Sequence, residues 1–425
     1  MRKFFYPSSI AVFGVADNPR NLAKNIILNC QEMEFAGEIY PVGRESGAVY
    51  GKEIIINPDS LPKGVDLAVI LVPAKFVAET LDICGRKGIR HVIISTGGFS
   101  EFRDKDNKAE IDALLMAERY GIRFIGPNCI GVICTDSGLC TPFNPLQPKS
   151  FKKGPVSLIV QSGGVTTHLA YQFSDEHVGF SKIISAGNKL DIDEIDLLEY
   201  LMDDEATEQI HLYLESIEHG RDLMRLVRRS KKPIVIFKSN LTWTASEIAK
   251  SHTAALSNND KIVDGALKQA GVVHVQDTHD MTVAAKALQL PPLKGDRLVA
   301  ISSSGGFSVI LGDACEKYGF KCPALPRELI DEIEGFRRGG VIRMSNPMDF
   351  GDVHDMKAFA FSLERCLALE EIDGLVLSFI YDPKIERMLG PGIGNPQKML
   401  NFTKKLCKTF NKPIALSFIA EKQHI

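Results

Sequence analysis

Hydrophobic residues recur along this chain in short continuous runs, each followed by a glycine or proline turn and then by a stretch with helical periodicity. Nearly continuous apolar strands that alternate with helices are typical of a parallel sheet covered on both faces. Helical stretches include Ala74 to Lys87 and Lys105 to Tyr120. The first five predicted strands are Ile10 to Val15, Ile39 to Val42, Leu67 to Val72, His91 to Ser95 and Arg123 to Ile125.

The same alternation continues to the end of the chain and predicts three domains. Pro142, Pro145 and Pro148, followed by basic residues, indicate a linker, and Pro291-Pro292 marks a second boundary. We therefore predict an α/β protein with a Rossmann-like domain over residues 1–148 and two flavodoxin-like parallel-sheet domains over residues 149–292 and 293–425. The sequence ends seven residues after Phe418 of its last predicted strand, so we expect the third domain to be short at its C-terminus.

The later strands are read from equally short apolar runs. In the second domain they are Val156 to Val160, Ser181 to Ser185, Ile210 to Leu214, Ile234 to Phe237 and Val272 to Val275. In the third domain they are Leu298 to Ser302, Gly374 to Phe379 and Ile414 to Phe418, with Asn395 to Thr409 as a helix between the last two.

Composition and charge narrow the classes of partner. A chain of 425 residues is too long for one compact domain, and its net charge of −3 gives no reason to expect nucleic acid or an anionic membrane. The basic, apolar start is neither a signal peptide nor a membrane span. Nine scattered cysteines without a Cys-x-x-Cys pair disfavour a disulfide framework and a zinc site, so we expect a cytoplasmic protein with reduced thiols.

Two glycine turns and one histidine carry the first chemical hypothesis. Ser162-Gly163-Gly164 and Ser304-Gly305-Gly306 each follow a predicted strand and open a predicted helix. Such a helix start presents unpaired N–H groups and the positive end of the helix dipole, which suits a phosphate. His252 lies in a polar segment between strand and helix, where a phosphoryl group could be carried on its imidazole. Ordinary turns and a surface histidine remain the alternatives.

The strand ends of the first domain predict a ligand site. Glycine or proline turns follow four of its strands, and in an open parallel sheet these carboxyl ends converge on one edge. Arg44 ends the second strand, where a basic residue suits a ligand phosphate better than a ribose diol. For Gly14 alone, a plain tight turn is an equal alternative. The residues expected around the ligand are Gly14, Ala16, Val72, Pro73, Lys75, Ser95, Gly97 and Asn128.

Other residues that could carry chemistry have simpler interpretations. Asp191, Asp193 and Asp196 could bind a metal, but acidic residues that open a helix favour its dipole, so no metal site is predicted. Cys129 reads as a buried thiol, and His211, inside a predicted strand, reads as a packing or surface residue.

The ordered motifs resemble the CoA-binding subunit of the NDP-forming acyl-CoA synthetases, relatives of the succinyl-CoA synthetase alpha subunit. The resemblance covers nearly the whole chain. In the first domain it rests on Val65 to Pro73, Ile94 to Glu101 and Gly126 to Gly131. In the later domains it rests on Gln161 to Gly164, Ser185 to Asp193, Tyr213 to Arg221, Ser251 to Leu256 and Asn346 to Asp349.

The resemblance implies a phosphoryl relay between acyl phosphate, a histidine and a nucleoside diphosphate. His252 matches the phosphorylated histidine, and Glu215 matches the glutamate that would hydrogen-bond its imidazole. It also implies CoA at the first-domain site and a phosphoryl group held between the Gly163-Gly164 and Gly305-Gly306 helix ends.

The sequence departs from the family pattern at Ala16, Trp243 and Ala254, and these departures bear on turnover more than on CoA binding. It also lacks an ATP-grasp segment. We therefore expect a partner ATP-grasp subunit, in an oligomer, to supply ATP or GTP and Mg²⁺, while this chain takes CoA and a small carboxylic acid. One alternative is a non-catalytic CoA- or acyl-CoA-binding protein. An NAD-binding oxidoreductase is disfavoured because the full glycine fingerprint is missing.

Overall fold

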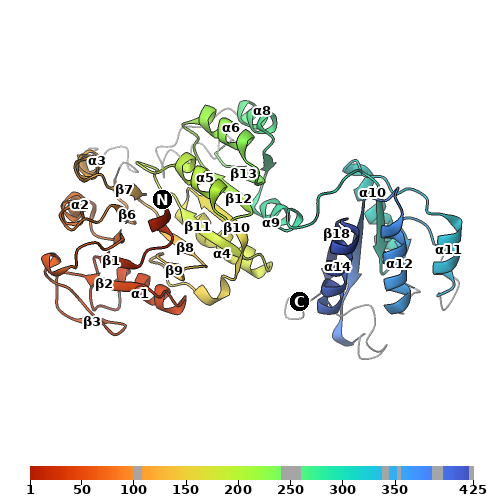
Figure 1. The fold of residues 1–425 in the computed structure, drawn as a ribbon, viewed down its shortest axis with the longest axis horizontal. Coiled ribbons are helices and arrows are strands. Elements are labelled where there is room, and N and C mark those ends of the chain that lie inside the picture. Colours follow the sequence, from red (N-terminus) through yellow and green to blue (C-terminus); the bar gives the residue numbers. More distant parts are fainter. Residues whose placement is uncertain (100–107, 241–259, 337–343, 352–355, 385–395, 421–425) are drawn as a thin grey trace. The chain divides into compact units, whose positions relative to one another are not determined.

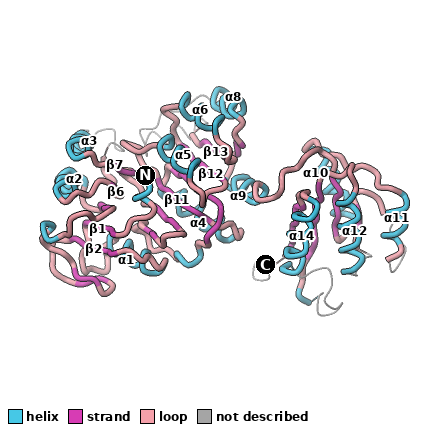
Figure 2. Tube along the Cα trace, viewed as in Figure 1, coloured by secondary structure: helices cyan, strands magenta, loops and turns pink. Residues whose placement is uncertain are grey.

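The computed structural model describes residues 1–99, 108–240, 260–336, 344–351, 356–384 and 396–420. Within this part, the chain forms two compact units, Met1–Lys286 and Ala287–Ile425, which are considered separately below. Strands alternate with helices in both units, as the magenta and cyan segments of Figure 2 show. The α/β class predicted from the sequence is therefore confirmed.

The first unit begins with a five-stranded parallel sheet in the order β2-β1-β5-β6-β7 (Figure 1). Its order reverses between β1 and β5, and such a switch point is where open parallel sheets bind ligands. The strands are β1 (Ser9–Phe13), β2 (Glu38–Val42), β5 (Leu67–Ile70), β6 (His91–Ile94) and β7 (Arg123–Ile125). The helices are α1 (Ala23–Glu32), α2 (Val77–Arg86) and α3 (Lys108–Tyr120), and a small hairpin joins β3 (Ala48–Val49) to β4 (Lys52–Glu53).

The second sheet has seven strands in the order β14-β13-β12-β10-β11-β8-β9. Its parallel strands are β10 (Lys153–Val160), β11 (Phe180–Ser185), β12 (Gln209–Leu214), β13 (Ile234–Lys238) and β14 (Val273–Val275). One edge of this sheet differs from the prediction that all its strands are parallel. There, β8 (Val132–Cys134) pairs antiparallel with β11 and forms a hairpin with β9 (Leu139–Cys140). The helices are α4 (Gly163–Asp175), α5 (Glu194–Asp203), α6 (Gly220–Arg229), α8 (Asp260–Ala270) and α9 (Thr278–Ala287).

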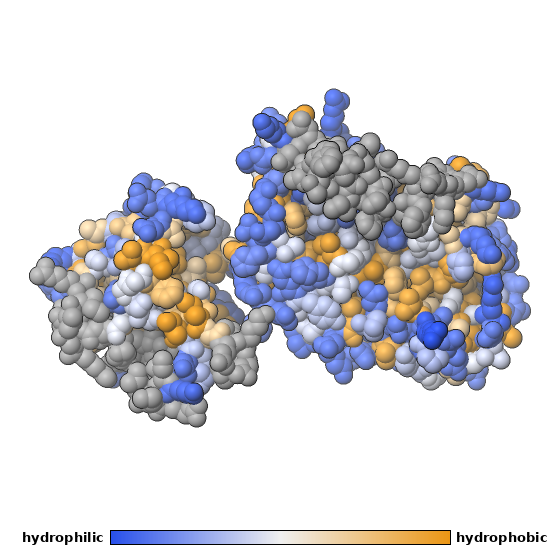
Figure 3. Space-filling model, turned by 180° about the vertical axis from the view of Figure 1, so that it is seen from behind, coloured by the Kyte–Doolittle hydropathy of each residue, from blue (hydrophilic) through white to orange (hydrophobic). Residues whose placement is uncertain are grey.

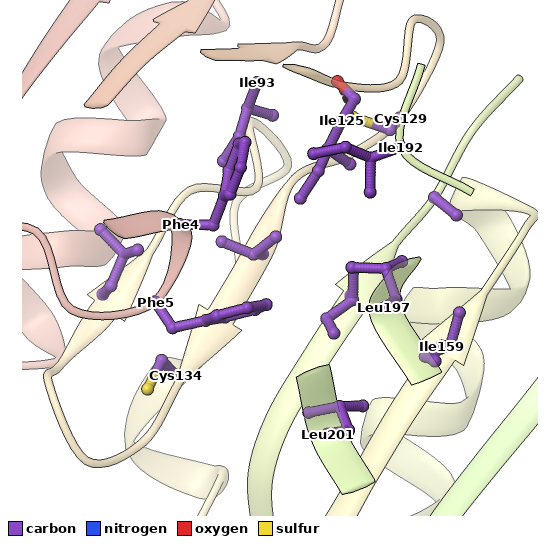
Figure 4. Packing of buried hydrophobic residues seen from close by; sticks show 14 of the residues in the cluster. Phe4, Phe5, Ile93, Ile125, Cys129, Cys134, Ile159, Ile192, Leu197 and Leu201 are labelled. Atoms are coloured by element: carbon purple, nitrogen blue, oxygen red, sulfur yellow. Dashed lines mark hydrogen bonds between the residues drawn. The ribbon is translucent and has the colours of Figure 1, made fainter. Parts of the chain in front are cut away.

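One hydrophobic core joins the two sheets of the first unit. Phe4 and Phe5, in the N-terminal segment, are fully buried, and Figure 4 shows them among side chains from both sheets, such as Ile93 of β6 and Ile159 of β10. The ring of Phe5 stacks on Tyr200 at a centroid distance of 5.0 Å. Burying aromatic rings contributes strongly to stability. The N-terminal segment is thus part of the core between the first two predicted domains.

The proline-rich segment predicted as a linker is tied to helix α1. Asn29 is buried and donates through Nδ2 to the carbonyl oxygens of Pro142 and Asn144 at 2.8 and 2.9 Å. Asn25 donates to the Phe143 carbonyl oxygen at 2.9 Å. Proline removes N–H donors but leaves the carbonyl groups available, and here side-chain amides satisfy them.

The second unit contains a four-stranded parallel sheet in the order β16-β15-β17-β18. Alternate residues of β18, Ala415, Ser417 and Ile419, are exposed, so one side of this strand is open to solvent. Apolar residues gather on the face of this unit that Figure 3 displays. The elements are β15 (Leu298–Ser302), α10 (Gly305–Lys317), α11 (Arg327–Glu334), β16 (Met348–Asp349), α12 (Met356–Ala368), β17 (Gly374–Ile380), α14 (Pro396–Phe410) and β18 (Ile414–Ile419).

Candidate functional site

Gly14, directly after β1, is required by a close backbone approach. Its φ is +93°, and a Cβ here would lie 2.1 Å from the Leu71 carbonyl oxygen. Its N–H donates to the Val42 carbonyl oxygen at 3.0 Å, as does that of Val15. These two N–H groups therefore belong to the sheet, and a ligand phosphate at this turn would meet the half-buried Ala16 beyond them.

Thr96 joins the ends of β5 and β6, a role that the sequence did not suggest. Its Oγ1 donates to the Val72 carbonyl oxygen at 2.7 Å and accepts from the Val72 N–H at 3.2 Å. Ser95, the residue predicted to meet the ligand, is itself buried, so its hydroxyl points away from solvent. A threonine immediately after a strand, before Gly97, is the signal that could have indicated this bridge.

Two exposed cations lie beside one aromatic ring at the switch point. The Arg44 guanidinium carbon is 4.2 Å from the centroid of the Phe76 ring, and Lys75 Nζ is 5.0 Å from the same centroid. Arg44 and Lys75 come from different strand ends, as predicted, whereas Phe76 was not singled out from the sequence. Positive charge next to a flat ring is suited to a ligand that carries both phosphate and a purine base.

Asn128 completes this edge and contacts the second domain. Its φ is +58°, and its Oδ1 lies 3.1 Å from where a Cβ of Gly97 would be. Its Nδ2 donates to Asn188 Oδ1, in the loop after β11, at 3.3 Å. The predicted ligand residues therefore lie at the carboxyl ends of the strands of one sheet, and this end of the sheet contacts the neighbouring domain.

The start of α4 has the geometry expected of an anion site. Ser162 caps the helix by accepting from the Val165 N–H at 3.4 Å, and its carbonyl accepts from Thr166. Within the described part of the chain, the N–H groups of Gly163 and Gly164 have no partner. A Cβ at Gly163 would lie 2.8 Å from Ile130 Cγ2, whereas Gly164 faces open space.

Gln161 joins this helix start to the turn that carries Glu215. Its Oε1 accepts from the N–H groups of Glu215 at 2.8 Å and Ser216 at 3.0 Å, and its Nε2 donates to Ser216 Oγ at 3.1 Å. The buried Lys238 donates to the Glu215 carbonyl oxygen at 2.9 Å. The backbone of Glu215 is thus held on both sides. No role for Gln161 was evident from the sequence, although this residue directly precedes the glycine turn.

The start of α10 resembles that of α4 in sequence but has a different neighbour. It lies in the second unit, where a Cβ at Gly305 would be 2.9 Å from the Asp349 carboxylate. Gly306 is exposed at the same helix start. His252, Trp243 and Ala254 lie outside the described residues.

The acidic residues around the start of α5 have structural partners. Asp193 caps the helix by accepting from the Ile195 and Asp196 N–H groups at 2.8 and 3.2 Å. Asp191 and Asp196 form ion pairs with Arg123 at 2.8 and 3.1 Å. Among the described residues, no group of three or more His, Cys, Asp or Glu side chains could hold a metal ion.

Two other candidates are buried: Cys129, as expected from the sequence, and His211, for which the sequence left a packing and a surface position open. Burial raises the pKa of the Cys129 thiol to about 12, so it stays protonated and unreactive. Burial also lowers the pKa of His211 to about 3, and its Nε2 is 2.8 Å from Gln209 Oε1.

A surface pocket of about 640 Å³ lies between α6 and α8 and contains none of the predicted site residues. Arginines Arg221, Arg225, Arg228 and Arg229 line it, together with Met224 and Gln269. None of the helices in the described ranges is both long enough and apolar enough to span a membrane.

Comparison with known proteins identifies the family. Residues 8–135 match a CoA binding domain, and residues 153–288 match a succinyl-CoA ligase like flavodoxin domain. The alpha subunit of ADP-forming acetate–CoA ligase II from Pyrococcus furiosus is 36% identical over 348 residues, covering 81% of this chain and 75% of that subunit. The alpha subunit of ligase I from the same organism is 33% identical over 400 residues, covering 90% and 84%.

Solved structures agree with these relatives. The apo dinucleotide forming acetyl-coenzyme A synthetase 1 of Candidatus Korarchaeum cryptofilum has a TM-score of 0.85 at 27% identity and covers 98% of this chain and 89% of that chain. The same protein in complex with phosphate and ADP also has a TM-score of 0.85. The relatives are named as ligases, which favours an enzyme over a non-catalytic binding protein. The chain therefore belongs to the alpha-subunit family of the NDP-forming acyl-CoA synthetases.

Proposed function

We propose that this chain is the CoA-binding and phosphohistidine-bearing subunit of an ADP-forming acyl-CoA synthetase. The enzyme would join a small carboxylic acid to CoA while ATP is cleaved to ADP and phosphate, reversibly. The observation that carries the proposal is the bond between Gln161, at the Ser162-Gly163-Gly164 helix start, and the Glu215 turn. The N–H groups proposed to bind phosphate and the backbone of Glu215 follow two paired strands of one sheet, β10 and β12, which supports the proposal.

The proposed reaction proceeds through three transfers in the direction of ATP formation. A phosphate oxygen attacks the thioester carbonyl of acyl-CoA, and the CoA thiolate leaves and takes up a proton. The acyl phosphate passes its phosphoryl group to a ring nitrogen of His252 and releases the carboxylate. ADP then accepts the phosphoryl group and leaves a neutral histidine. Glu215 would accept from the other ring N–H and stabilise the positive imidazole.

The helix starts at Gly163-Gly164 and Gly305-Gly306 are each proposed as phosphoryl-binding ends, since unpaired N–H groups at a helix start stabilise negative charge. CoA is proposed to bind along the first sheet edge. Arg44 and Lys75 would face its phosphates, and Thr96 would hold the Val72-Pro73 strand end in place. The residues proposed to contact CoA are Gly14, Ala16, Val72, Pro73, Lys75, the Ser95 backbone, Gly97 and Asn128.

We also propose that a separate ATP-grasp subunit completes the enzyme as a hetero-oligomer and binds the nucleotide with Mg²⁺. ATP is favoured over GTP because the related subunits belong to ADP-forming ligases. A cytoplasmic location is proposed because all nine cysteines are free thiols.

The test uses the full chain together with its ATP-grasp partner, Mg²⁺ and ATP labelled at the γ-phosphate. We expect acid-labile label on His252, and acyl-CoA formation once acid and CoA are added. The chain alone should be inert with ATP and acid, while still binding CoA in calorimetry. Binding of CoA without any label, in the presence of a competent partner, would favour the non-catalytic alternative.

A further inference from the structure

The loop after β11 is fixed against the first sheet. The N–H groups of Asn188, Leu190 and Ile192 donate to carbonyl oxygens of Pro127, Gly126 and Phe124 at 2.9, 3.1 and 3.2 Å. A Cβ at Gly187, whose φ is +63°, would lie 2.2 Å from the Pro127 carbonyl oxygen. Such close contact leaves little freedom to this loop, because packed backbone cannot shift without losing several hydrogen bonds at once.

Lys189 projects from this loop into a buried ion pair. Its side chain is 3% exposed and that of Glu194 is 2% exposed, and Nζ lies 2.8 Å from Glu194 Oε2. Removing two charges from water is costly, so such a pair needs good geometry and further hydrogen bonds. Lys189 Nζ makes one such bond, to the Ser216 carbonyl oxygen at 3.0 Å.

Ser216 directly follows Glu215, and the two peptide groups are held by three buried side chains. Gln161 accepts from both N–H groups, Lys238 donates to the Glu215 carbonyl oxygen, and Lys189 donates to that of Ser216. With its backbone fixed at both ends, the turn restricts where the Glu215 carboxylate can lie. Pre-organisation of this kind matters when a carboxylate must align an imidazole.

We infer that Lys189 is a positioning residue for the proposed phosphoryl transfer, acting through the Ser216 carbonyl on the Glu215 turn. The inference rests on the proposed function. Lys189 acts only through this turn and does not itself contact substrate. Its neighbour Asn188 accepts from Asn128 Nδ2 at 3.3 Å, so the same loop also lies against the predicted CoA site.

The test compares two buried lysine–carboxylate pairs, Lys189–Glu194 and Lys182–Asp204, that lie close to β11 and α5. Lys189→Met with Glu194→Gln removes both charges together, so that no unpaired ion remains buried. Lys182→Met with Asp204→Asn is the matched control, because Lys182 is fully buried and pairs with Asp204 at 2.6 Å, but within β11 rather than beyond its carboxyl end. Lys189→Arg keeps a cation that can donate to Ser216. Each variant is assembled with the partner subunit.

We expect the Lys189→Met/Glu194→Gln enzyme to label His252 roughly 10-fold more slowly at saturating ATP, with its KM for ATP changed less than about 2-fold. Lys189→Arg should recover part of the rate. The control should lose stability in urea but keep its labelling rate. Equal labelling rates for wild type and the Lys189→Met/Glu194→Gln enzyme, or an equal loss in the control, would overturn the inference. Absence of label in the wild type would instead reject the proposed function.

Discussion

The two Ser-Gly-Gly turns of this protein share a sequence pattern but have different surroundings. At α4, Ser162 caps the helix through its side chain, and Gly163 lies against the apolar Ile130. At α10, Ser304 makes no side-chain cap among the described residues, and Gly305 lies against the Asp349 carboxylate. A carboxylate at a helix start already stabilises the dipole and repels a second anion. The comparison indicates that α4 is the better anion site.

The largest effect should come from removing the group that the phosphoryl would occupy. We expect His252→Ala or His252→Gln to abolish labelling from ATP, because a covalent intermediate is lost altogether. CoA affinity, measured by calorimetry, should change less than about 2-fold, since the proposed CoA residues lie on the first sheet. If His252→Ala, assembled with its partner, still turned over normally and took up label, the proposal that the two turns bind a phosphoryl group carried by His252 would be wrong.

Glu215→Gln should have the next largest effect on labelling. This variant tests whether the turn next to the α4 start acts on the histidine. The amide still accepts from an imidazole N–H but no longer stabilises its positive charge. A hydrogen bond to a charged group is worth about 1.5–3 kcal/mol, so labelling should slow by roughly 10- to 100-fold. Single-turnover labelling measures this. An unchanged labelling rate in Glu215→Gln would show that Glu215 takes no part in the phosphoryl transfer. The link from Glu215 to the start of α4 would then give that helix no catalytic role.

Adding one methyl group to each turn tests the comparison directly. Gly163→Ala would place a Cβ 2.8 Å from Ile130, a buried side chain branched at Cβ, and overpacking of this kind costs about 1–3 kcal/mol. We expect labelling to slow roughly 10-fold. Gly305→Ala meets only the end of Asp349, which can rotate, and Gly164→Ala meets nothing within 4 Å, so both should stay within about 3-fold of wild type. A larger loss in Gly305→Ala than in Gly163→Ala would reverse the ranking.

Neutralising the carboxylate at α10 should make the two turns more alike. We expect Asp349→Asn to tighten phosphate binding to the chain by roughly 2- to 5-fold, because a charge at a helix start is worth about 0.3–1 kcal/mol. Calorimetric titration with inorganic phosphate measures the change. Asp313→Asn, an exposed change on the same helix beyond its first turn, is the control and should have no effect. Weaker phosphate binding in Asp349→Asn would show that this carboxylate helps to build the site.

The last prediction concerns the caps and is an effect on stability rather than on labelling or phosphate binding. Ser162→Ala removes the acceptor for the Val165 N–H and should lower the free energy of unfolding in urea by about 1 kcal/mol. Ser304→Ala removes no cap of this kind and should stay within about 0.5 kcal/mol of wild type. Equal losses would mean that the two helix starts are held alike in solution.

Much of the fold could be predicted because its signals are local. The apolar runs at Leu67, Ile210 and Leu298 became strands at nearly the expected residues. The hairpin of β8 and β9 was missed because its strands have only three and two residues, and β11, the strand on which β8 pairs, lies about 50 residues away. A short apolar segment does not reveal from its own sequence which sheet it will join.

The candidate site divides in the same way. The sequence determined the glycine turns at strand ends, the glutamate after β12 and the family motifs, because strand, turn and helix preferences act over a few residues. Only the tertiary structure decided that Gln161 and Lys189 hold the Glu215 turn and that Asp349 faces Gly305. Those contacts join residues 27 to 54 positions apart, and side chains so distant meet only after the sheets have paired and packed.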